Sequence, residues 1–196
     1  MKIIGLTGLT GAGKSTVAQK LMAYGCYHID ADKVARNVIN NNENVKNKLK
    51  ERFGEDVINA DGTTNRPLLA SRAFADEQST LDLNAITHPA VIEEIEAIIK
   101  DIKEVGYRGI IVDAIALFES GLDTLCDFNV TVVAPKEIRL ERIMKRDNIT
   151  KEKALERINA QKDESFFTSK ANFVLWNYEP YDLNVEIKPI LLQIGM

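Results

Sequence analysis

Cysteine, histidine, tryptophan and long apolar runs are all scarce in this chain. Its 196 residues include two cysteines, two histidines and one tryptophan. Cys26 and Cys126 stand far apart and form no C-x-x-C pair, so we expect buried, reduced thiols. No apolar run approaches the roughly 20 residues that span a bilayer, and no signal peptide precedes the first apolar segment. These absences favour a cytoplasmic protein with no membrane partner.

Positive charge is not in excess either. Lysine and arginine total 25 against 29 aspartates and glutamates, which leaves a net charge of −4. A broad cationic surface for duplex nucleic acid is therefore not expected, although a local cationic cleft is compatible with this balance. The proportions of hydrophobic residues, 45%, and charged residues, 28%, are those of an ordinary globular protein. We expect no nucleic-acid partner, and a monomer or a weak homo-oligomer.

Glycine is concentrated near the beginning of the chain, in the segment Gly8-Leu9-Thr10-Gly11-Ala12-Gly13-Lys14-Ser15. This segment matches G-x-x-x-x-G-K-[ST], the loop that holds nucleotide phosphates, and it lies between a strand-like run and a helical one. Backbone N–H groups and the positive end of the helix can bind an anion there. Lys14 supplies a cation, and Ser15 a hydroxyl for Mg²⁺. The alternative is an ordinary glycine-rich turn between a strand and a helix.

Apolar segments that suit strands alternate with helical segments along the chain. The strand segments are Lys2–Thr7, Tyr27–Asp30, Gly109–Asp113, Phe128–Val133 and Phe173–Trp176. This alternation predicts an α/β fold in which helices flank a parallel sheet of about five strands, with ligands at the carboxyl ends of the strands. We expect a P-loop core over residues 1–32, 105–136 and 166–196. Residues 33–104 and 137–165 are interpreted as helical insertions over the site, and an apolar stripe over 90–102 predicts a core-facing helix in the first of them.

A second chemical signal is Asp30-Ala31-Asp32, where the second strand is expected to end. Residues two apart in an extended chain point to the same side, which predicts that both carboxylates face the phosphate loop. Such a group can accept the proton of a substrate hydroxyl and align its oxygen with a terminal phosphate. Alternatively, one aspartate caps the helix that follows, and the two roles are compatible.

A third signal follows Pro135, where Arg139, Arg142 and Arg146 recur at helical spacing and share one face. Guanidinium groups suit phosphate because they are planar, always charged and rich in donors. A solvated face paired with nearby glutamates is the alternative. Thr150 is expected to cap a second helix, on which Arg157 and Gln161 would share a face.

Taken together, these residues resemble those of the dephospho-coenzyme A kinase family. The resemblance rests on the phosphate loop, the two aspartates with Ala35-Arg36 after them, Thr87-His88-Pro89, Leu117-Phe118-Glu119, Arg142-x-x-x-Arg146-Asp147, and Gln161. It implies ATP-dependent phosphorylation of the ribose 3′-hydroxyl of dephospho-coenzyme A (dephospho-CoA), the final step of coenzyme A synthesis. It also implies a P-loop kinase core, a dephospho-CoA-binding insertion over residues 33–104 and a lid over residues 137–165.

The resemblance also assigns site residues. It implies that Asp32, as the base, Lys14 and Arg142 are catalytic. The ATP-binding residues it implies are Gly11, Ala12, Gly13, Lys14, Ser15, Thr16, Arg142, Arg146 and Asn177, with Mg²⁺ at Ser15. Asp30, Asp32, Arg36 and His88 would bind the acceptor.

Several positions leave alternatives open. Ile115-Ala116 replaces the Pro-Leu that is usual in similar enzymes, and Asn177-Tyr178-Glu179 lacks a usual glycine. His28 is interpreted as a strand side chain, His88-Pro89 as a site segment or a bend between two helices, and Asp113 as a possible magnesium ligand through water.

Rival functions are another small-molecule kinase, of nucleoside monophosphate or shikimate type, and a GTP-dependent switch. The switch is disfavoured because no Asn-Lys-x-Asp guanine element follows a strand.

Overall fold

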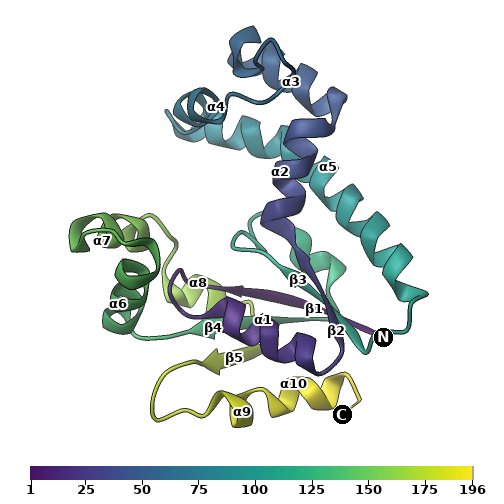
Figure 1. Cartoon of the computed structure of the whole chain (residues 1–196), viewed down its shortest axis with the longest axis vertical. Coiled ribbons are helices and arrows are strands. Elements are labelled where there is room, and N and C mark those ends of the chain that lie inside the picture. Colours follow the sequence, from purple (N-terminus) through teal and green to yellow (C-terminus); the bar gives the residue numbers. More distant parts are fainter. Residues whose placement is uncertain (196) are drawn as a thin grey trace. The chain divides into compact units, whose positions relative to one another are not determined.

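A five-stranded sheet with the order β2-β3-β1-β4-β5 organises the fold (Figure 1). The computed structural model describes residues 1–195. The strands are β1 (Lys2–Gly8), β2 (Cys26–Asp30), β3 (Gly109–Asp113), β4 (Phe128–Val133) and β5 (Phe173–Trp176). The ladders that join β1 to β3, β1 to β4 and β4 to β5 are parallel. The five predicted strands are confirmed, with ends that agree to within one residue.

The central strands are apolar along their length because helices cover the sheet. Ile4, Ile111 and Val130 are completely buried, as is typical of parallel strands packed on both faces. α1 (Lys14–Ala23) contacts β1 and β3, α8 (Glu164–Thr168) contacts β4, and α9 (Leu183–Glu186), which is followed by α10 (Lys188–Gln193), contacts β5. The prediction of an α/β fold is therefore confirmed. β1 and β3 end side by side, since Leu6 of β1 is paired with Asp113 of β3.

Two helices that follow β4 form a small cluster of their own. α6 (Lys136–Asp147) and α7 (Lys151–Asn159) bury Ile143, Ala154 and Ile158 between them. The predicted cap of α7 is confirmed, since the Thr150 hydroxyl accepts a hydrogen bond from the Lys153 N–H.

The chain divides into two compact units. Met1–Ile29 and the chain from Ile102 onward form the sheet unit, and Asp30–Asp101 forms a helical unit. The helical unit contains α2 (Ala31–Asn41), α3 (Glu43–Phe53), a short 3-10 turn over Glu55–Val57, α4 (Arg66–Ala73) and most of α5 (Glu77–Lys103). The expected role of residues 33–104 in acceptor binding stays a prediction at this point.

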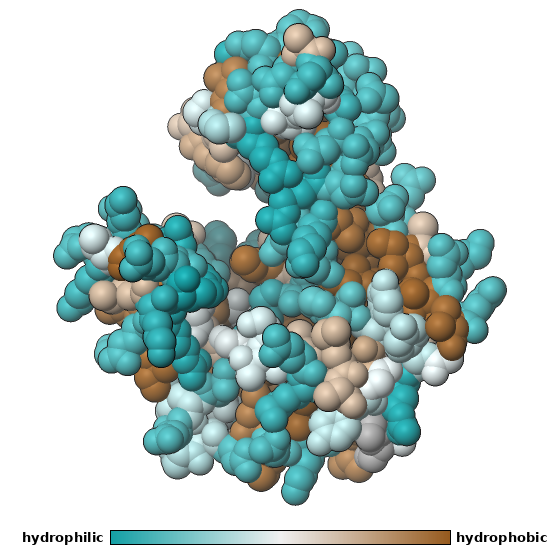
Figure 2. Space-filling view, in the orientation of Figure 1, coloured by the Kyte–Doolittle hydropathy of each residue, from teal (hydrophilic) through white to brown (hydrophobic). Residues whose placement is uncertain are grey.

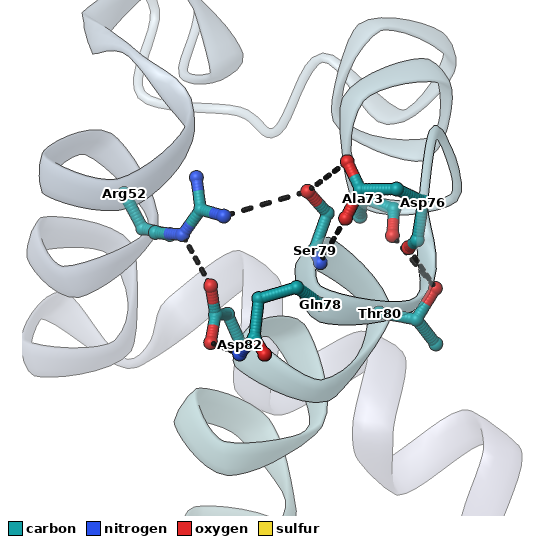
Figure 3. A network of polar contacts seen from close by, with 7 residues as sticks. All are labelled: Arg52, Ala73, Asp76, Gln78, Ser79, Thr80 and Asp82. Carbon is teal, nitrogen blue, oxygen red and sulfur yellow. Dashed lines mark hydrogen bonds and ion pairs between the residues drawn. The ribbon is translucent and has the colours of Figure 1, made fainter.

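A polar network ties three helices of the helical unit together (Figure 3). Arg52 of α3 donates to Asp82 of α5 at 2.5 Å and reaches the Ser79 hydroxyl at 3.4 Å. Asp76 accepts from the Ser79 N–H at 2.7 Å at the start of α5. Thr80 donates to the carbonyl of Ala73 at the end of α4. These bonds fix the beginning of α5 against α3 and α4.

The interpretation of His88-Pro89 as a bend between two helices is wrong. α5 runs for 27 residues with Pro89 inside it. A proline removes one helical N–H and displaces one carbonyl, but the predicted apolar stripe, which is buried at Val91, Ile95 and Ile99, stabilises the helix beyond it. Despite this length, no helix within residues 1–195 is long and apolar enough to span a membrane.

Candidate active site

The phosphate loop connects β1 to α1 and requires glycine at two positions. Gly11 and Gly13 have φ angles of 79° and 92°, in the left-handed region that glycine adopts without strain. A side chain at Gly13 would also collide with the amide group of Asn177, and one at Gly11 would collide with the backbone of Arg139. Conformation and close packing therefore both demand glycine here.

The loop borders a cavity of about 310 Å³. Besides the loop backbone, the cavity is lined by Lys14, Ser15, Asp113, Ile115, Arg142 and Arg146. Gly13 caps α1 without a side chain, and within residues 1–195 no acceptor contacts the N–H groups of Gly13, Lys14 and Ser15. Unpaired N–H groups at a helix N-terminus bind anions, helped by the helix dipole. The cavity is thus suited to a chain of phosphates.

Lys14 and Asp113 form a nearly buried ion pair in this cavity. One carboxylate oxygen of Asp113 accepts from the Lys14 ammonium, and the other lies 3.0 Å from Nε2 of His28 on β2. Burial alone would raise the pKa of Asp113, but the hydrogen bond from His28 and the charge of Lys14 outweigh it and hold this pKa below its ordinary value. His28 is therefore more than a strand side chain, because it bonds the carboxylate at the end of β3.

Arg142 braces the outer side of the phosphate loop. Its guanidinium donates to the carbonyls of Gly11 at 3.3 Å, Ala12 at 3.2 Å and Asn177 at 2.8 Å. The side chain of Asn177 donates to the same Ala12 carbonyl at 2.8 Å. The middle of α6 and the residue after β5 thus converge on the loop, and they hold its carbonyls so that its N–H groups face the cavity.

The other two arginines of the predicted stripe differ from Arg142. Arg146 lines the cavity and is paired with Asp147 at 2.8 Å. Arg139 is only 7% exposed, and within residues 1–195 its Nε and Nη1 have no partner. Burial lowers the pKa of Arg139, while Glu164 and Glu137 oppose this shift. Two members of the stripe therefore reach the cavity, and Arg139 packs behind the loop.

Gln161 makes a contact that the sequence interpretation missed. We expected it on a helix face with Arg157, but α7 ends at Asn159. Arg157 instead pairs with Asp147, and the Gln161 side chain accepts a hydrogen bond from the Thr10 N–H at 2.7 Å. The expected helical pairing is wrong because the chain leaves the helix before it reaches Gln161. The resemblance had singled out this glutamine without a role.

The four expected acceptor residues lie in the helical unit. Asp30 is the N-cap of α2, and its carboxylate accepts from the Lys33 N–H at 2.9 Å. Asp32 and Arg36 are exposed, one turn apart on α2, and His88 is half-buried on α5. Burial lowers the pKa of His88. Thr16, which was expected to bind ATP, is exposed in the first turn of α1.

The geometric argument for the two aspartates is wrong, although the capping alternative is confirmed. β2 ends at Asp30 and α2 begins at Ala31, so Asp32 has helical backbone. Two residues of helix turn a side chain through about 200°, and the alternation of an extended chain does not apply. Asp30 therefore stabilises the helix start, which leaves Asp32 as the candidate for chemistry.

No ready-made metal cage accompanies these groups. Within residues 1–195, no cluster of three or more His, Cys, Asp or Glu side chains could hold a metal ion. The Asp113 carboxylate and the Ser15 hydroxyl line one cavity. They fit Mg²⁺, which prefers oxygen ligands and takes only one or two from protein when it is bound together with phosphates and water.

Known proteins resemble the chain over nearly its whole length. The sequence model of the dephospho-CoA kinase family matches residues 2–181. The dephospho-CoA kinase of Corynebacterium diphtheriae is 38% identical over 177 residues, 90% of this chain and 88% of the relative. That of Bacillus licheniformis is 38% identical over 175 residues, 89% and 87% of the two chains.

Solved structures show the same relationship. The dephospho-CoA kinase from Campylobacter jejuni superimposes with a TM-score of 0.70 at 25% identity, over 98% of this chain and 96% of that one. A shikimate kinase from Bacteroides thetaiotaomicron reaches a TM-score of 0.54 at 14% identity, over 100% and 99% of the two chains, and so shares the fold. With a family match over most of its residues and relatives at this identity, the chain belongs to the dephospho-CoA kinase family.

Proposed function

We propose that the protein transfers the terminal phosphoryl group of ATP to the ribose 3′-hydroxyl of dephospho-CoA, which yields coenzyme A and ADP. This is the final step of coenzyme A biosynthesis. The observation that carries the proposal is the cavity at the phosphate loop, where unpaired N–H groups, Lys14 and Arg142 surround space for a triphosphate in a chain of this family.

Lys14 is the mobile cation of the proposed reaction. Asp113 pairs with its ammonium, and this pairing keeps the ammonium next to the N–H groups of the loop. The terminal phosphate of ATP competes with Asp113 for this ammonium. The ammonium then stabilises the negative charge that develops on the transferring phosphoryl group.

Arg142 keeps the loop in its phosphate-binding form and contributes positive charge at the cavity. Its three bonds to carbonyls satisfy much of its donor capacity, and Arg146 supplies a more exposed guanidinium. Gly11, Ala12, Gly13, Ser15 and Thr16 bind phosphate oxygens through the loop and the first turn of α1, and Asn177 lies at the adenine side.

Asp32 is the proposed base. It is exposed in the first turn of α2, where it can accept the proton of the 3′-hydroxyl and orient its oxygen. Asp30 positions this turn as its cap, and Arg36 and His88 contact the acceptor. Closure of residues 137–165 excludes water, which would otherwise compete with the hydroxyl.

Mg²⁺ is the proposed cofactor. Ser15 and Asp113 would hold it, and when bound it neutralises charge on the phosphates of ATP. We also propose a cytoplasmic location, no nucleic-acid or membrane partner, and a monomer or weak homo-oligomer.

The test is acceptor-dependent turnover of MgATP by the purified protein. Dephospho-CoA should give ADP and a product whose new phosphate lies on the 3′-oxygen by ³¹P NMR, whereas nucleoside monophosphates and shikimate should give little. Asp32→Asn should lower turnover by about 100-fold or more while ATP binding persists. Asp101→Asn, at an exposed position of α5, should match the unaltered protein. Preferred turnover of a nucleoside monophosphate or shikimate would overturn the proposal.

A further inference from the structure

The helical unit contains a second cavity, remote in sequence from the phosphate loop and different in character. It is a groove of about 210 Å³ bordered by α2, α4 and the beginning of α5. Its lining includes Ile39, Leu69, Phe74 and Leu83, together with Arg36 and Arg66. All of these residues lie within Asp30–Asp101, so the groove is complete within one unit.

The apolar part of the groove reaches solvent. Phe74 is 65% exposed, although most phenylalanines are buried. Figure 2 shows apolar residues at the surface around α4. An exposed apolar patch beside a groove marks a binding site for an apolar group.

Two guanidinium groups border this apolar surface. Arg36 and Arg66 are exposed, and within residues 1–195 neither makes an ion pair. The other two arginines of the helical unit behave differently, since Arg52 pairs with Asp82 and Arg72 with Asp56. Unpaired arginines next to a groove provide forked donors for the oxygens of a phosphate or diphosphate.

The order of groups along α2 matches the order of groups along the acceptor. Asp32, Arg36 and Ile39 follow at i, i+4 and i+7, so they share one face of the helix. Asp32 and Arg36 are separated by about 6 Å along the axis, a length comparable with a ribose measured from its 3′-oxygen to its 5′-phosphate. Ile39 comes next and lines the groove. The base, the cation and the apolar surface therefore follow one another along α2. The 3′-hydroxyl, the diphosphate and the pantetheine arm follow one another in the same order along dephospho-CoA.

We propose that Arg36 and Arg66 hold the diphosphate of dephospho-CoA and that the groove takes its pantetheine arm. This inference rests on the proposed function. It makes Arg66 and Phe74 acceptor-binding residues, and it explains how the enzyme would distinguish dephospho-CoA from a plain adenine nucleotide, which has no arm to bury. In this proposal the contacts of the arm are uniform binding, made equally in the ground state and the transition state, so their loss raises KM and leaves kcat unchanged.

Steady-state kinetics at saturating MgATP test the proposal. Arg66→Gln should raise KM for dephospho-CoA about 10-fold or more, because it removes charge-assisted hydrogen bonds. Phe74→Ser should raise the same KM about 3- to 10-fold through lost apolar contact. In both variants kcat should change by less than about two-fold, the pattern of lost uniform binding. Since both side chains are exposed, circular dichroism should show an intact fold.

Matched controls and a fragment of the acceptor make the test specific. Lys48→Gln removes an exposed cation from α3, and Leu81→Ser removes an apolar side chain that is 53% exposed on α5. Both should leave KM unchanged. Pantetheine 4′-phosphate, which has the arm and one phosphate but no ribose, should compete with dephospho-CoA, and both test variants should weaken this inhibition about 5-fold or more.

The outcomes separate this inference from the proposed function. If the unaltered protein phosphorylates dephospho-CoA but all four variants keep its KM, the function stands and the groove proposal fails. The groove proposal also fails if Phe74→Ser changes only the mass measured by light scattering, since the patch would then join copies of the chain. No turnover of dephospho-CoA by the unaltered protein would count against the function itself.

Discussion

Single residues decide whether the loop binds phosphate, and Lys14 is the sharpest test. Lys14→Ala removes the ammonium that Asp113 holds in the cavity, and with it the cation that we propose follows the transferring phosphoryl group. We expect turnover with dephospho-CoA to fall about 100-fold or more and MgATP to bind more weakly. Stopped-time assays and calorimetric titration of MgATP measure the two effects.

A second lysine on the same helix provides the control. Lys20 lies in the last turn of α1 and bonds the side chain of Asn184 at 2.6 Å, away from the cavity. Lys20→Ala should keep turnover within about two-fold, since an exposed polar contact is worth little. Equal losses in the two variants would show that a general effect on α1, and not the phosphate contact, is responsible.

Sequence reasoning at this scale worked where a local motif carries the chemistry. The phosphate loop was predicted because glycine conformations, a lysine and a helix start lie within eight residues. The same reasoning failed for Asp32, because α2 begins at Ala31, directly after the predicted strand end at Asp30, and leaves no extended residues between strand and helix. It also missed the bond between His28 and Asp113, which joins side chains 85 residues apart through the pairing of strands.

Among the elements, the segment after α7 is tied to the phosphate loop by one hydrogen bond, from the Thr10 N–H to Gln161. Gln161→Glu keeps an acceptor for this bond but adds a negative charge beside the phosphate loop. We expect the Kd for MgATP to rise about 10-fold, and this rise should shrink at high salt. Gln161→Ala loses the bond without adding charge and should weaken binding less. If the alanine variant were the weaker binder, the hydrogen bond and not the charge would control the site.

Elements with strong periodicity were predictable, whereas their ends and interruptions were not. The five strands and the buried stripe of Val91, Ile95 and Ile99 follow from apolar spacing alone. α5 continues through Pro89 because the residues on either side of the proline are stabilised by packing. The helix propensities of single residues do not include this packing free energy. For the same reason the position of Gln161 beyond α7 could not be read from helical spacing.

For the whole molecule, the sequence was sufficient to predict the fold class but not the surface of the helical unit. Parallel-sheet architecture follows from the alternation of elements and was confirmed. The groove at Phe74 and Arg66 is assembled from α2, α4 and α5, whose residues are spread over much of the helical unit. Only the packed unit reveals that an exposed phenylalanine and two arginines share one surface.

Global stability should depend on pH through His88. Burial lowers its pKa in the folded state, while in the unfolded chain it is about 6.5. Between these two values the unfolded chain binds more protons, so the free energy of unfolding decreases as pH falls below about 6.5 and stops decreasing below the folded-state pKa. His88→Asn, which cannot titrate, should flatten this part of the curve. Urea unfolding from pH 5 to 8 measures the difference between the two proteins. Parallel curves across that range would mean that His88 has the same proton affinity in both states, and its neutral, partly buried form would then have no part in stability.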